Sequence, residues 1–282
     1  MKRSLLILCF GIALSGCSNI DILNDSTSDD YYGITLLETT DLAVLPNDVN
    51  WAIVFPGPFR WGAIQTNSDD LPADWHWEEI DKLVADAKRE NIELVGIIWP
   101  YAEWDQVKCH SSNFVVPAVF SEIGQSPYSP CDEGLYKNFL HELVERYTDD
   151  IHYWEITDSP SLQQPPLARF IGTPEEYTKL LEVSYQAIKE ANADAYVLNG
   201  GIAGLTSESI AFWGPQFETG IADYIDILNI QESAQGDEIS MSAYHSWFDI
   251  YQLDKITWIT RVSSAEKFDS VDKVFYTQRY EN

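Results

Sequence analysis

Apolar, strand-like runs alternate with helical patterns from residue 31 to the end of the chain. Short apolar runs of this kind, separated by helices, indicate a parallel sheet or barrel. We expect eight strands, at residues 33–37, 51–55, 92–99, 151–156, 195–200, 225–230, 256–259 and 273–276. The regular alternation of strand and helix predicts an α/β fold.

Three of the intervening segments have the apolar spacing of amphipathic helices. One apolar face lies within residues 80–87 and another within residues 136–147. A third helix is expected to begin at Thr173-Pro174-Glu175-Glu176, because this is a capping box with proline at the first helical position, and to end near Ala191. The segments near 40–48, 241–252 and 264–270 are short and predict poor helices.

Eight strands with intervening helices in about 250 residues predict a (β/α)8 barrel, the TIM barrel. Only residues 278–282 follow the last expected strand, so we expect the barrel to be shortened at its C-terminus, without the last helix. An apolar groove between the first and last strands would then be covered by the tether, the loops or a protein partner. An open doubly wound sheet is the alternative, but no Gly-x-Gly-x-x-Gly or Walker sequence supports a nucleotide fold.

The N-terminal residues are expected to direct export rather than to fold. Lys2 and Arg3 precede an apolar stretch that is too short to span a bilayer as a stable helix. Leu14-Ser15-Gly16-Cys17 resembles a bacterial lipobox, which implies a signal peptide over residues 1–16 and a lipid on Cys17. A polar tether would continue to residue 30, followed by one domain over 31–282. Ser18 favours the outer membrane; the alternative is a plain signal peptide.

Charge and cysteine content narrow the classes of partner. With 45 Asp and Glu against 17 Lys and Arg, the formal net charge is −28, which excludes nucleic-acid binding and leaves the lipid anchor as the expected membrane contact. Once Cys9 leaves with the signal and Cys17 is lipidated, Cys109 and Cys131 remain as a disulfide pair. There is no Cys-x-x-Cys and the histidines are scattered, so neither a metal site nor a cofactor is expected.

Aromatic residues are frequent at the carboxyl ends of the expected strands, where TIM barrels hold their functional groups. Flat rings at a concave mouth suit the C–H face of a pyranose, so we expect carbohydrate as the ligand. The alternative is that these rings only pack the top of the barrel. The residues expected to contact an oligosaccharide or polysaccharide are Trp61, Trp99, Trp104, Asp158, Gln231, Glu232, Arg261 and Tyr276.

Several motifs, in chain order, resemble clan A glycoside hydrolases of the family 39 type. They cover nearly the whole domain: Phe59–Gln65, Asp74-Trp75, Leu94–Trp104, Tyr136–Phe139, Glu145–Tyr147, Tyr153–Ile156, Gly172–Tyr177, Asp226–Ile230, Trp258–Thr260 and Val271–Phe275. The resemblance implies a TIM barrel with a sugar-binding mouth. It also assigns the positions at which the family carries its two catalytic glutamates.

Both of those positions are substituted in this chain. In the family's Tyr-Trp-Glu-Ile-Trp-Asn-Glu-Pro the final Glu is the general acid/base, and here Ser159 stands in its place, preceded by Asp158. The family's Trp-Ile-Thr-Glu ends in the nucleophile, and here the residue is Arg261. The family's His-Tyr pair on the sixth strand is Gln231-Glu232.

These substitutions remove the chemistry that the resemblance would imply. Retaining hydrolysis needs two carboxyl groups about 5 Å apart. Serine cannot protonate a leaving group near neutral pH, and an arginine opposes the positive charge that develops in the transition state. Glu155 lies four residues from Ser159, about 13 Å along a strand. Asp158 is expected to point to the other face of its strand, unless the backbone leaves strand geometry there.

Three functions remain open. The first is a surface lipoprotein that binds carbohydrate without hydrolysing it. The second is an active glycosidase that uses relocated carboxylates, for which Asp158, Glu232 and then Glu103 are the candidates. The alternative interpretation of these three residues is that they are solvated acids in loops, without a catalytic role. The third is a structural or assembly lipoprotein. Arg261 would either form an ion pair with Asp158 or Glu232, or bind the carboxylate of a uronic acid.

Overall fold

The computed structural model describes residues 31–37, 41–67, 74–110, 127–163, 168–233, 236–263, 268 and 270–279. The expected signal peptide, Cys17 and the tether lie outside the described residues. None of the helices within the described ranges is long and apolar enough to cross a membrane.

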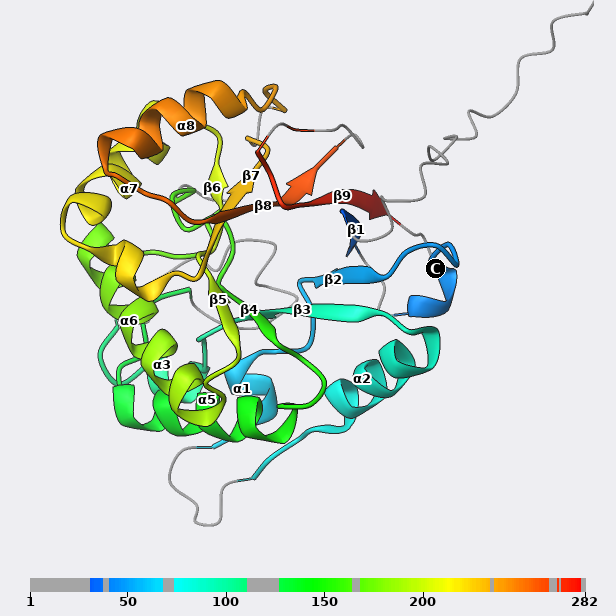
Figure 1. Cartoon of the computed structure of the whole chain (residues 1–282). Helices are drawn as coiled ribbons and strands as arrows, with labels where there is room; N and C mark the ends of the chain where they lie inside the picture. The colour runs from blue at the N-terminus through cyan, green and yellow to red at the C-terminus, as the bar shows by residue number, and fades with distance from the viewer. Residues whose placement is uncertain are drawn as a thin grey trace, which may run out of the picture.

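The described strands form one closed parallel barrel (Figure 1). β1 pairs with both β2 and β9, and β5 pairs with both β4 and β7, so the ring closes on itself. The two-residue β6, which we did not predict, adds beside β7. The strands are β1 (Tyr32–Leu37), β2 (Trp51–Phe55), β3 (Glu93–Ile98), β4 (Tyr153–Ile156), β5 (Tyr196–Leu198), β6 (Ile202–Ala203), β7 (Ile227–Gln231), β8 (Ile256–Val262) and β9 (Lys273–Arg279). All eight expected strands are present, which confirms the TIM barrel.

Helices surround the barrel on its outer side (Figure 1). They are η1 (Leu42–Val44), α1 (Trp61–Ile64), α2 (Glu78–Glu90), α3 (Glu103–Gln106), α5 (Glu133–Arg146), α6 (Pro174–Ala191), α7 (Ser207–Glu218), η2 (Ile221–Tyr224) and α8 (Met241–Ile250). The three predicted helices correspond to α2, α5 and α6, and the capping box of α6 forms as expected: the Thr173 hydroxyl accepts from Glu176 N at 3.2 Å.

The prediction of a poor helix at 241–252 was wrong, because α8 is a regular ten-residue helix. Its buried residues are Met241, Tyr244, Trp247 and Phe248. This i, i+3, i+6, i+7 spacing makes one apolar face, and packing of that face outweighs the weak intrinsic helix propensity of its aromatic residues.

The barrel and its helices form two apolar layers. Residues at alternate strand positions, such as Ile53, Val95 and Ile227, fill the inside of the barrel. Their neighbours, such as Leu94 and Leu228, pack outward in the cluster that contains the helices. Successive side chains on a strand point to opposite faces, so one apolar run supplies both layers.

The expected apolar groove beside the last strand is covered within the chain. On the outer faces of β1 and β9, Ile34, Leu36 and Val274 have no exposed surface and Tyr276 is 8% exposed. Among the described residues, no long helix covers these two strands (Figure 1). Their burial nevertheless removes the exposed groove that favoured a protein partner at this edge.

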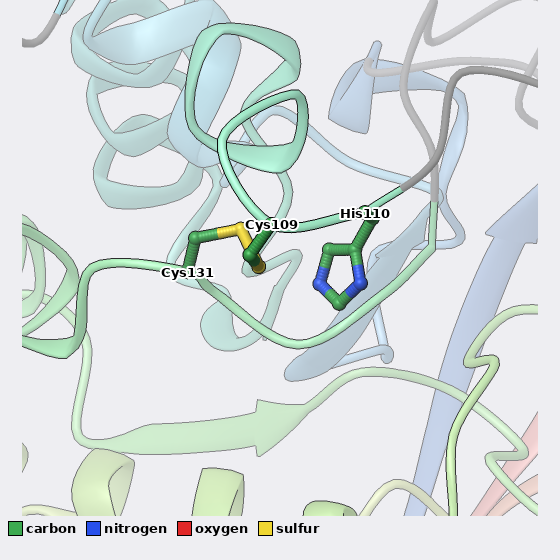
Figure 2. A group of neighbouring side chains, drawn as sticks. All are labelled: Cys109, His110 and Cys131. Carbon is green, nitrogen blue, oxygen red and sulfur yellow. A yellow bond between two sulfur atoms is a disulfide. The ribbon is translucent and has the colours of Figure 1, made fainter.

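Cys109 and Cys131 form the predicted disulfide, with their Cα atoms 5.7 Å apart. It ties the segment after α3 to the start of α5, and His110 lies beside the bond (Figure 2). The two sulfurs and a ring nitrogen of His110 lie within 4.8 Å of one another. Metals bind the thiolate form of cysteine, and neither sulfur is a thiolate while the disulfide is intact. His110 Nε2 lies 2.9 Å from the Ser129 carbonyl.

Candidate functional site

The mouth of the barrel, at the carboxyl ends of the strands, brings together Asp158, Ser159, Gln231 and Arg261. β4 ends at Ile156, and the next residues leave strand geometry: Thr157 and Ser159 have φ of 63° and 43°. Strand alternation therefore stops, and Asp158 and Ser159 both contact the Gln231 amide. Gln231 Nε2 donates to Asp158 Oδ1 at 3.0 Å, and the Ser159 hydroxyl donates to Gln231 Oε1 at 2.5 Å. Asp158 therefore does not point to the other face: the backbone leaves strand geometry here, which is the exception that the sequence analysis allowed.

Arg261 forms an ion pair with Asp158, one of the two partners we expected. Two of its guanidinium nitrogens contact the two carboxylate oxygens of Asp158. Asp158 has no exposed side-chain surface, whereas Arg261 is 19% exposed. Glu232, the other expected partner, instead accepts from the backbone N–H and the hydroxyl of Ser263, at 2.9 and 2.8 Å.

A β-bulge in β8 aims Arg261 into the barrel. Ile259 pairs with Val274 while Val262 pairs with Tyr276, so β8 has one more residue than β9 over this stretch. A bulge places two consecutive side chains on one face of a sheet. Here the Thr260 hydroxyl donates to Asn229 Oδ1 at 2.7 Å inside the barrel, and its neighbour Arg261 reaches Asp158 from the same side.

Arg169, which sequence reasoning did not identify, is the second arginine on Asp158. It follows β4 in a long loop, is 14% exposed, and contacts Asp158 Oδ2. Its backbone carbonyl accepts from the Tyr101 hydroxyl. The only sequence signal is a basic residue within the apolar segment 167–170, in a chain with few basic residues.

Both guanidinium groups lie over the ring of Phe55, at the end of β2. The guanidinium carbons are 4.8 Å from the ring centroid for Arg169 and 4.5 Å for Arg261. An aromatic face attracts a cation, and a guanidinium can also stack on it. The mouth therefore contains two arginines, one aspartate and one aromatic ring in mutual contact.

The pKa values of Glu155 and Asp158 are shifted in opposite directions, although Gln231 Nε2 contacts both carboxyl groups. Burial, followed by the negative charge of Asp158, raises the pKa of Glu155 well above its usual range, which favours the uncharged form of this carboxyl. Burial opposes ionisation of Asp158 as well, but Arg169 and Arg261 outweigh it and lower the pKa of Asp158. Glu155 Oε1 accepts from Gln231 Nε2 at 3.1 Å, and its Oε2 has no partner among the described residues.

Gln231 holds this polar layer together because of a glycine on the neighbouring segment. Gly201 has φ of 83°, and a Cβ at this position would overlap the Gln231 side-chain amide. Only glycine offers both this backbone conformation and this close approach. The Gln231 amide is thereby fixed between the strand ends that carry Glu155, Asp158 and Thr260.

Retaining hydrolysis needs two accessible carboxyl groups about 5 Å apart, and the carboxyl groups of this cluster are buried. Glu155 and Asp158 have no exposed surface, and the oxygens of Asp158 are occupied by arginines. Ser159 is 2% exposed and donates to Gln231. A guanidinium group beside a sugar opposes the positive charge that develops in that transition state. The site can instead offer hydrogen-bond donors, positive charge and the partly exposed Phe55 ring.

The predicted sugar-stacking rings differ in their exposure. Trp61 and Trp99 have no exposed surface, so neither has a ring face open to a ligand in this conformation, and Tyr276 is nearly buried. Trp104 is half-buried, packs edge-on against Trp61, and has Lys108 5.2 Å from its ring centroid. Glu103 begins α3 beside it. Of the four predicted rings, Trp104 is therefore the one with part of its surface free.

No protein-family model matches the sequence, and no curated protein is significantly similar to it. Solved structures are similar in fold. A glucosidase from Croceicoccus marinus has a TM-score of 0.62 at 16% identity, covering 88% of this chain and 58% of its own. A family 39 glycoside hydrolase from Bacteroides cellulosilyticus WH2 has 0.55 at 14% identity, covering 84% and 50%.

A third structure, xylanase 10B from Thermotoga petrophila RKU-1 in complex with xylobiose, has a TM-score of 0.53 at 13% identity, covering 89% of this chain and 83% of its own. The chain therefore spans only half to three-fifths of the first two proteins, but most of the xylanase. At these identities the likeness is one of fold. The chain is a (β/α)8 barrel of the kind found in glycoside hydrolases.

Proposed function

We propose that this chain is a glycosidase-like barrel that binds carbohydrate without hydrolysing it. The observation that carries the proposal is the Arg169–Asp158–Arg261 cluster at the carboxyl ends of β4 and β8. It fills the mouth of the barrel with a paired carboxylate and two cations, where hydrolysis would need two accessible carboxyl groups.

The ligand class follows from the fold and from the groups at the mouth. The barrels it is similar to include a glucosidase and a xylanase in complex with xylobiose. Phe55 and Trp104 keep part of their surface exposed, and the two arginines present donors beside Phe55. An aromatic surface with a few polar donors is the usual composition of a small-ligand site.

One observation favours hydrolysis by relocated carboxylates. A raised pKa at Glu155 near a lowered pKa at Asp158 is the kind of opposite shift that an acid/base pair requires. Both side chains are completely buried, however, and Asp158 is held by two arginines. The structural or assembly role loses its main support, because the apolar edge at β1 and β9 is covered within the chain.

The expected place of action is the bacterial cell envelope. The lipobox-like Leu14-Ser15-Gly16-Cys17 supports export, cleavage and lipidation, with the barrel displayed beyond a short tether. A surface-bound barrel that binds a glycan would retain that glycan at the cell without consuming it. Mass spectrometry of the protein from membranes tests this part: a lipid-modified Cys17 at the mature N-terminus is the expected result, and an unmodified chain beginning elsewhere contradicts it.

A glycan array followed by calorimetry tests the binding function. We expect binding to a defined set of glycans, with recovery of the ligand uncut. Phe55→Ala should lower the affinity about fivefold or more. The matched control is Tyr196→Ala, because Tyr196 is 41% exposed and lies at the opposite, amino end of the barrel on β5. Absence of binding to any glycan, or equal losses in the two variants, would contradict the proposal.

A further inference from the structure

The mouth of the barrel carries an excess of positive charge in a strongly acidic protein. Arg169 and Arg261 both pair with one carboxylate, that of Asp158, and burial raises the pKa of the neighbouring Glu155, which favours its uncharged form. The nearest other acid of the predicted site, Glu232, is bonded to Ser263 instead. The whole chain has a net charge of −28, so this local excess runs against the general composition.

The two guanidinium groups have more donors than the aspartate accepts. Each guanidinium has five N–H groups in a planar fork. Asp158 engages one nitrogen of Arg169 and two of Arg261. The Nε atoms of both arginines are buried and have no acceptor among the residues that the structure describes, so the donors that a ligand would reach are the remaining N–H groups of the terminal nitrogens. Asp158 is fully buried beneath them, whereas the arginines keep 14% and 19% of their side-chain surface exposed, so they form the outer layer of the cluster.

We propose that Arg169 and Arg261, stacked on Phe55, form a subsite for the carboxylate of an acidic sugar, a uronic acid residue of the bound glycan. This inference rests on the proposed carbohydrate binding and names the class of its ligand. The pair already holds one carboxylate, Asp158, through the two-nitrogen contact of Arg261, which shows that its geometry suits a planar anion. A second carboxylate would balance the remaining charge and take up unused donors.

The proposal also explains why both cations are arginines. A lysine carries the same charge but cannot present two parallel N–H donors to a carboxylate, and it does not stack flat on an aromatic ring. Because the rest of the protein repels anions, recognition depends on this one local cluster. Acidic and neutral forms of one sugar should therefore differ strongly in affinity.

Calorimetry with matched sugars tests the subsite. The purified protein is titrated with oligogalacturonic acid, with oligoglucuronic acid, with the methyl ester of each, and with a sulfated oligosaccharide. We expect at least one acid to bind at least tenfold more tightly than its uncharged ester and than the sulfated sugar. Arg169→Lys and Arg261→Lys should each lower the affinity for the acid about ten- to a hundredfold and leave that for the ester within about twofold. Retained ester binding shows that a variant is folded.

Arg89→Lys is the control, because Arg89 pairs with Asp86 and Glu90 on the exposed surface of α2 and should leave both affinities unchanged. Three results would contradict the uronic acid subsite: equal affinity for acid and ester, higher affinity for the sulfated sugar, or unchanged affinity for the acid in both Arg169→Lys and Arg261→Lys. None of these results would contradict the proposed binding of carbohydrate. If neither acid nor ester binds while neutral glycans do, the subsite is again wrong. If no glycan of any class binds, the proposed function fails as well.

Discussion

Replacing Asp158 with asparagine should strongly destabilise the protein. The substitution keeps the shape of the side chain and an acceptor for Gln231, which now donates to Asp158 at 3.0 Å. Among the residues that the structure describes, it removes the one carboxylate that forms ion pairs with Arg169 and Arg261, and leaves the two cations in a largely buried site. Removing one partner of a buried ion pair lowers the free energy of unfolding by about 3–5 kcal/mol.

An exposed ion pair provides the matched control. Asp81 also accepts from an arginine, Arg146, and from the Tyr147 hydroxyl, but its side chain is 45% exposed whereas that of Asp158 has no exposed surface. Solvent screens such a pair, so Asp81→Asn should lower the free energy of unfolding by about 1 kcal/mol or less. The same chemical change is thus compared at a buried and at an exposed site.

Urea denaturation at pH 7, followed by circular dichroism, measures both variants. The double variant Asp158→Asn with Arg169→Gln should recover part of the loss, because it removes one of the two unpaired cations. A loss below about 1 kcal/mol for Asp158→Asn, or a loss equal to that of Asp81→Asn, would refute the reasoning. The charge cluster would then contribute no more than an ordinary surface pair.

Three further predictions concern the barrel and its mouth. Burial favours the protonated form of Glu155, whereas an unfolded glutamate loses its proton above its ordinary pKa of 4.5, so the free energy of unfolding of the wild-type protein should fall as pH rises above 4.5. Glu155→Gln should remove this part of the pH dependence. Urea denaturation at pH 5 and pH 8 measures it, and an equal change in the free energy of unfolding of wild type and variant would disprove the prediction. Replacing both Cys109 and Cys131 with serine should lower the free energy of unfolding by about 3 kcal/mol, measured by thermal and urea unfolding. Gly201→Ala should destabilise the fold more than an ordinary surface substitution and weaken glycan binding, since its Cβ would displace Gln231; an unchanged melting temperature would contradict the packing argument.

The barrel could be predicted because buried parallel strands leave a simple pattern in the sequence. Trp51–Phe55 is apolar throughout and is found as β2 with the predicted bounds. The capping box at Thr173 likewise fixed the start of α6 through local hydrogen bonds. The helix α8 was missed because its apolar face is aromatic, and aromatic residues have weak helix propensity on their own.

The chemistry of the mouth depends on places where the backbone departs from regular strand geometry, and no hydrophobic or polar pattern in the sequence predicts these places. The Asp158 carboxylate lies in the barrel because Thr157 and Ser159 adopt positive φ, and Arg261 points inward because of the bulge in β8. Arg169 arrives from a loop with no periodicity to place it. The sequence predicted one partner of Arg261, Asp158, but the second cation, Arg169, and the raised pKa of Glu155 follow only from the packed structure.

Product analysis of glycans incubated with the protein tests the central claim, the absence of hydrolysis, most directly. Neutral and acidic oligosaccharides and aryl β-glycosides are incubated with the wild-type protein, with Asp158→Asn and with Glu232→Gln, and the sugars are then separated by chromatography. The account predicts that every substrate is recovered uncut, because Ser159 and Arg261 stand at the two positions that the family resemblance assigns to catalytic glutamates and because Asp158 is held by two arginines. Cleavage by the wild-type protein that is abolished by Asp158→Asn or Glu232→Gln would contradict it and establish an active glycosidase.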